Sequence, residues 1–117
     1  MSTLSLVLAI ILGVVFLVVG LAKLTARPSV VANFKRWGYA DVIRMAVGAV
    51  EVLAAALLLV GTAVPALAVS GVLLVIWVML GALFTHQRAG DPIGQWVPPV
   101  VLLVLAVVLA YRLLPEG

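Results

Sequence analysis

Four long apolar runs, separated by polar segments, dominate the pattern of this chain. They cover residues 3–22, 42–61, 64–84 and 96–114. Because about 20 apolar residues cross a bilayer as a helix, each run is long enough to be one membrane span. The first run has no basic segment before it and is longer than the apolar core of a signal peptide, so we expect a retained helix. The pattern predicts an all-α integral membrane protein, an antiparallel bundle of four transmembrane helices.

The polar segments differ in length and in charge. A short turn, "GTAVP", joins the second and third spans, whereas "KLTARPSVVANFKRWGYAD" and "THQRAGDPIGQ" join the other pairs. In an antiparallel bundle both long connections lie on one side, with six of the seven basic residues: Lys23, Arg27, Lys35, Arg36, Arg44 and Arg88. The positive-inside rule therefore predicts cytoplasmic long loops and both termini outside. We expect a multi-pass protein of the plasma membrane, in bacteria the inner membrane.

Composition narrows the classes of function. The 117 residues are 67% hydrophobic and 9% charged, against roughly 25% charged in ordinary globular domains. We expect one domain, residues 1–117, with the lipid bilayer as its solvent. A net charge of +3 is too small to indicate a nucleic-acid partner, and the lack of cysteine excludes disulfides and thiolate metal sites. With a single histidine, no metal site is expected within one chain.

One acidic residue, Glu51, lies inside the second apolar run. A charged side chain at the centre of a span costs roughly 2.5–3.5 kcal/mol on insertion scales, so such residues generally face the bundle interior and have a partner. One interpretation is a structural ion pair with Lys23 or Arg44. The other is a functional acid or base whose protonation is set by burial and by these cations. The sequence leaves both open.

Helical spacing places other residues beside Glu51. Arg44, Gly48 and Glu51 form one stripe, since seven residues make two turns and about 10 Å. Phe16, Gly20 and Lys23 form a second stripe on the first span. The two glycines allow either close helix contact or space for a ligand. Together the stripes predict a shallow pocket, open to the cytoplasmic interface, with Glu51 near its floor.

Three further residues are candidates for this pocket. His86, the only histidine, is either an ordinary helix-end residue or a group that exchanges protons with a ligand. Trp77 falls near the middle of the third span and either packs or lines the pocket. Asp91 either belongs to a simple "GDP" turn, pairs with Arg88 or caps the pocket. The aromatic residues Trp37, Tyr39 and Trp96 lie where interfacial belts are expected.

Four motifs in order resemble one family. They are "FLVVGLAKL" (16–24), "GAVE" (48–51), "MLGALFTH" (79–86) and "RAGDPIGQWVPPVVLLVL" (88–105). Together they resemble the DoxX-like family of small four-helix membrane proteins over essentially the whole chain. By that resemblance Lys23, Glu51 and His86 match its characteristic polar positions. The resemblance also implies a link to quinone-dependent oxidoreductase subunits and oxidative-stress complexes, although a shared fold can carry many activities.

Three functional hypotheses follow. The first is an enzyme for a lipophilic small molecule, in which Glu51, Lys23, Arg44 and His86 carry acid–base chemistry such as isomerisation, cyclisation or epoxide opening. Phe16, Gly20, Gly48, Trp77 and Asp91 would then surround the ligand. The second is a quinone-binding or accessory subunit of a membrane oxidoreductase, which requires a redox partner because no cofactor motif is present. The third is a small proton-coupled exporter, and in each case a homo-oligomer is an alternative to a single chain.

Overall fold

Four long helices form the framework of the protein. The computed structural model describes residues 1–114, in which four helices are long and apolar enough to cross a membrane. They are α1 (Thr3–Leu24), α3 (Asp41–Val60), α4 (Pro65–Ala89) and α5 (Val97–Arg112), which continues a short 3-10 turn, η1 (Ile93–Gln95). The predicted fold class, an all-α membrane protein with four spans, is confirmed.

The first long connection contains a helix that the apolar pattern did not predict. Helix α2 (Pro28–Arg36) begins at a proline, which costs no hydrogen bond in a first helical turn. Its Phe34 is buried against the bundle, while Lys35 and Arg36 at its end are exposed. This nine-residue segment is amphipathic and too short to give the long apolar signal on which the spans were recognised.

Helix α4 extends five residues beyond the predicted end of the third span. The polar residues after Phe84 continue the helix to Ala89, because their side chains lie at the end of the bundle and need no lipid contact. Gly90 then ends it with φ +69°, a left-handed conformation that glycine adopts without strain.

Helices α1 and α3 pack closely where Gly20 meets Gly48. A Cβ atom on Gly20 would lie 3.0 Å from the carbonyl oxygen of Gly48, and one on Gly48 would lie 3.0 Å from that of Gly20. There is no room for a side chain on either residue. Of the two roles predicted for these glycines, the structure has close helix contact and not space beside a ligand.

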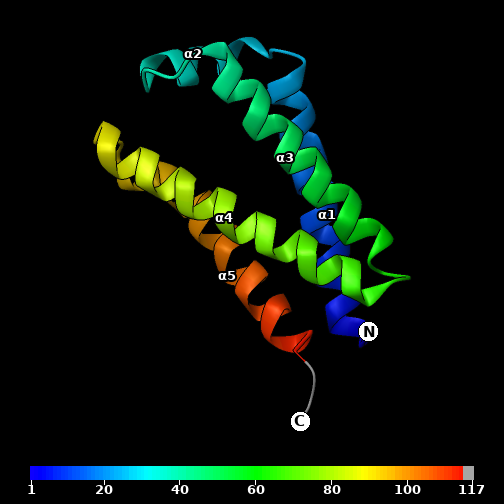
Figure 1. The fold of residues 1–117 in the computed structure, drawn as a ribbon. Helices are drawn as coiled ribbons and strands as arrows, with labels where there is room; N and C mark the ends of the chain where they lie inside the picture. The colour runs from blue at the N-terminus through cyan, green and yellow to red at the C-terminus, as the bar shows by residue number, and fades with distance from the viewer. Residues whose placement is uncertain (115–117) are drawn as a thin grey trace.

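The two helix pairs diverge toward one end of the bundle. In Figure 1, α1 and α3 form one arm and α4 and α5 the other; the arms lie close near the α3–α4 turn and separate toward α2. The core fills the closed end with buried residues from all four spans, including Leu12, Leu58, Val75 and Leu109. The outer faces are covered by exposed apolar side chains, as expected for surfaces in contact with lipid. We call the end where the arms separate the α2 end.

Candidate functional site

A pocket of about 590 Å³ lies between the two arms at the α2 end. All five helices contribute to its wall, which is mainly apolar and aromatic. Phe16 on α1 and Met79 on α4 lie at its buried inner end, next to the core. The polar side chains in the wall are few: Lys23, Asn33, Tyr39, Glu51, Thr85 and His86.

Glu51 and Lys23 form an ion pair in this wall. The Lys23 ammonium lies 2.7 Å from Oε1 of Glu51, and the exposed fractions of the two side chains are 17% and 2%. Gly48 makes this contact possible, because the stem of Lys23 crosses α3 where a Cβ on Gly48 would be 2.8 Å from the Lys23 Cβ. Glu51 is one helical turn further along the same face. Of the two cations that the sequence offered, the structure thus pairs Glu51 with Lys23.

Arg44 lies outside the pocket wall. Its guanidinium donates a hydrogen bond to the backbone carbonyl of Lys23 and lies 3.8 Å from the carboxylate of Asp41. The carbonyls in the last turn of a helix have no partner within it and attract cations. The sequence-based hypothesis that Arg44 faces a ligand is therefore corrected. Arg44 instead donates to a backbone carbonyl in the last turn of α1 and holds the backbone that carries Lys23.

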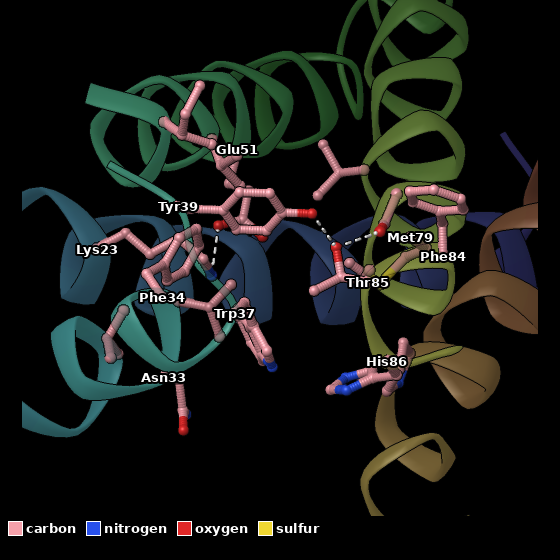
Figure 2. Close-up of a pocket in the computed structure, with 18 of the residues that line it drawn as sticks. Lys23, Asn33, Phe34, Trp37, Tyr39, Glu51, Met79, Phe84, Thr85 and His86 are labelled. Carbon is pink, nitrogen blue, oxygen red and sulfur yellow. Dashed lines mark hydrogen bonds and ion pairs between the residues drawn. The ribbon is translucent and has the colours of Figure 1, made fainter. Parts of the chain in front are cut away.

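The opposite wall comes from the end of α4. The Thr85 hydroxyl donates its hydrogen to the carbonyl of Gly81 at 2.9 Å. Because that hydrogen is already used, the bond of 2.8 Å between Tyr39 and Thr85 has the Tyr39 hydroxyl as its donor. Figure 2 shows the Tyr39 ring reaching from the α3 side across to Thr85. This hydrogen bond joins the two arms. The sequence predicts only an interfacial aromatic belt for Tyr39 and gives no signal of its role in the pocket wall.

His86 is held in place by Asp91. Its Nδ1 lies 2.7 Å from one oxygen of the Asp91 carboxylate, and the Trp37 ring packs edge-on against the imidazole. The same carboxylate accepts hydrogen bonds from the Trp37 indole at 3.1 Å and from Arg36 at 2.5 Å. The bonds from Arg36 and then from His86 lower the pKa of Asp91 to about 2. Asp91 is therefore ionised at neutral pH, and His86 donates to it through Nδ1.

Asp91 joins two segments and does not face the pocket itself. Its partners Arg36 and Trp37 end helix α2, so the cluster fixes α2 to the corner between α4 and α5. Of the predicted alternatives for Asp91, pairing with Arg88 does not occur; the Arg88 guanidinium instead donates to the carbonyl of Trp37 at 2.8 Å. We call Arg36, Trp37, His86 and Asp91 the Asp91 cluster.

The predicted ligand-facing residues thus divide into two groups. Phe16 and Trp77 are part of the pocket wall, as are Lys23, Glu51 and His86. Within residues 1–114 the wall includes neither Gly20 nor Gly48, which lie between helices, nor Arg44 and Asp91, which lie behind other pocket residues. Sequence reasoning missed the contributions of Asn33 and Phe34 from α2 and of Trp37 directly after it, because it did not predict that helix.

Comparisons with known proteins agree with this architecture. The model of one family, described as the DoxX-like family, matches residues 7–109. The match includes all five helices in whole or in large part, and with them the Lys23–Glu51 pair and the Asp91 cluster. A search of curated proteins and a search of solved structures each found no match.

Proposed function

The chain belongs to the DoxX-like family of membrane proteins, and from its pocket we propose that it binds a lipophilic small molecule whose polar head group exchanges protons with Glu51. The Lys23–Glu51 pair is the head-group site in this proposal, and the aromatic and aliphatic wall holds the apolar body. Lys23 keeps the carboxylate paired when no ligand is present.

One observation carries the proposal: the ion pair lies at the edge of the α1–α3 contact, where both side chains line a cavity. An ion pair that served only to fix the register of α1 and α3 would need no space beside it. Instead, about 590 Å³ of mainly apolar space adjoins Lys23 and Glu51. Ligand sites typically combine such an apolar cavity with a few polar groups that orient the ligand.

The chemistry available to this pocket is proton transfer. A carboxylate beside an ammonium can accept a proton from a bound head group and return it, and His86 offers a second proton-exchanging group from α4. Because Nδ1 of His86 is hydrogen-bonded to Asp91, Nε2 is the ring nitrogen left to exchange a proton with a ligand. Isomerisation, cyclisation and epoxide opening need only such groups and no cofactor, and we propose acid–base chemistry of this kind.

A quinone is the second candidate ligand. Its ring carries carbonyl oxygens on opposite sides, and the pocket has proton-exchanging groups on two walls, Lys23 and Glu51 on one arm and His86 on the other. Aromatic side chains such as Phe34 and Trp37 supply flat surfaces for a ring. In this case a partner protein of a redox complex would supply the electrons.

The proposal is tested by the molecules that stay bound during purification. We expect the protein extracted in mild detergent to retain a lipophilic compound, identified by mass spectrometry, whose class separates a quinone from other ligands. Glu51→Gln should lower its retention by about tenfold, because it replaces a charged partner of the head group. Asp41→Asn is the matched control, since it makes the same change at an exposed position of α3. Full retention in a folded Glu51→Gln protein would refute the role of the carboxylate.

We also propose an orientation for the bundle in a bacterial inner membrane. The α2 end carries Lys35, Arg36 and Arg88, and the positive-inside rule puts this end in the cytoplasm. The pocket would then lie toward the cytoplasmic leaflet. Reporter fusions within residues 25–27 and at the N-terminus test this placement, and a cytoplasmic signal from the N-terminal fusion would reverse it.

A further inference from the structure

The pocket has an aromatic and aliphatic rim on the membrane-facing side of the bundle. Trp77 and Phe84 on α4 are 75% and 62% exposed, and Ile43 on α3 is 43% exposed, although all three line the pocket. They belong to helices that are long and apolar enough to cross a membrane, so lipid is the medium expected at their outer surfaces. The wall of the pocket is therefore continuous with the lipid-facing surface between α3 and α4.

Gly81 lies in the middle of this rim. It is four residues from Trp77, one turn along the same face of α4, and it lines the pocket. A Cβ atom on Gly81 would meet no atom within 4 Å, whereas one on Gly20, Gly48 or Gly71 would collide with a neighbouring helix. Gly81 is thus not required for close packing. It is eight residues, about 12 Å, from the end of α4, and it lies within the apolar span that ends at Phe84.

Polar contacts, by contrast, cross the α2 end of the pocket. The Tyr39–Thr85 hydrogen bond joins the arms there, and Arg88 donates to the carbonyl of Trp37 and lies over the Tyr39 ring, 4.9 Å from its centroid. The Asp91 cluster fixes the end of α2 to the same corner. Phe34 and Trp37, which lie at the α2 end, form part of the pocket wall.

From these observations we infer that the ligand enters the pocket sideways from the lipid, through a portal between α3 and α4 at Gly81. The inference rests on the proposed function and specifies the class of ligand. A molecule that enters here has its polar head at Lys23 and Glu51 and an apolar tail that extends past Gly81 and Trp77 toward the acyl chains. The ligand is then a membrane-dissolved amphiphile and not a solute taken from water.

A photoreactive fatty acid tests the portal. The wild-type protein is reconstituted in vesicles of phosphatidylcholine and phosphatidylglycerol that contain palmitic acid with a diazirine on its chain, and crosslinks are mapped by mass spectrometry. We expect labelling of the inner residues Phe16 and Met79. Gly81→Leu should slow this labelling by about tenfold, since its side chain projects into the portal. The variant should still fold, because leucine is a better helix former than glycine and no neighbour is in its way.

Two control variants make the result specific. Leu73→Phe enlarges a lipid-facing residue of α4 that does not line the pocket, and it should leave the labelling rate unchanged. Val104→Phe enlarges a lipid-facing residue of α5 that does not line the pocket, and it should also leave the labelling rate unchanged. Labelling as slow in Leu73→Phe or Val104→Phe as in Gly81→Leu would overturn the portal, because the effect would not depend on Gly81.

The outcomes also separate the portal from the proposed function. Inner labelling at the wild-type rate in Gly81→Leu would refute the portal and leave the binding pocket in place. If Phe16 and Met79 of the wild-type protein were never labelled while lipid-facing Leu73 was, neither the lipophilic pocket nor its portal would stand.

Discussion

The Lys23 ammonium of α1 lies 2.7 Å from the Glu51 carboxylate of α3, and the two residues join helices that touch backbone to backbone one turn away. The pair therefore lies between a tightly packed helix contact and an open space. On one side is the close contact of Gly20 and Gly48, which fixes the two helices. On the other side is the pocket, whose wall includes both side chains.

Removing one member of the pair should destabilise the protein far more than removing both. Lys23→Met leaves a buried carboxylate without its counterion, and we expect a loss of about 3 kcal/mol. In the double variant Lys23→Met with Glu51→Gln no charge is left, so most of this loss should be recovered. Reversible unfolding in mixed micelles measures both. Equal and additive losses would mean that the two side chains do not interact.

The glycines of α3 and α4 should respond oppositely to the same substitution. Gly48→Ala places a Cβ against the backbone of α1, and overpacking of this kind costs roughly 1–3 kcal/mol. Gly81→Ala meets open space and should leave stability unchanged or raise it, by about 1 kcal/mol at most. The same unfolding assay compares them. A stable Gly48→Ala protein would contradict the close contact of α1 with α3.

The attachment of α2 should depend on pH only in acid. The pKa of Asp91 is lowered from 3.8 to about 2, so its contribution is complete above about pH 4 to 5 and is lost as the pH falls toward 2. Amide hydrogen exchange of residues 28–36 should accelerate over this interval. In Asp91→Asn the exchange should already be several-fold faster at neutral pH. Loss of protection near neutral pH in the wild type would show that another group holds α2.

The link between the two arms should be measurable as a coupling energy. Tyr39→Phe and Thr85→Val each remove one partner of a single hydrogen bond, and the double-mutant cycle should give about 1 kcal/mol. Tyr111→Phe is a suitable control, because Tyr111 is exposed on α5 and far along the chain from this contact. A coupling near zero would mean that Tyr39 does not join the arms.

The sequence predicted the framework because each span is marked by its own apolar run. The Lys23–Glu51 pair was also within reach, since the helical period and the cost of a buried charge limited the partners of Glu51 to two cations. The sequence could not decide between Lys23 and Arg44, because that choice depends on how far α1 extends beside α3. Arg44 reaches the last carbonyls of α1 and is used there.

The shape of the pocket could not be predicted for a physical reason. In a membrane protein, pocket-facing and lipid-facing positions are both apolar. The sequence therefore does not show that Phe16 is buried at the inner end of the pocket whereas Trp77 is exposed at its rim. The divergence of the two arms depends on helix packing angles, which the apolar pattern does not encode. The partners of Asp91 depend on the position of α2 beside the end of α4. Helix α2 is too short to give a recognisable apolar pattern in the sequence.

The most direct test is an experimental structure of the protein in lipid nanodiscs, without added ligand and after the mildest extraction. We predict elongated density between the arms, with its polar end within hydrogen-bond distance of Glu51 or Lys23 and its other end passing Gly81. The opposite result would be arms packed together, with the side chains of Phe16 and Met79 filling the space and no cavity beside Glu51. That structure would reduce the ion pair to a contact between helices and would contradict the account.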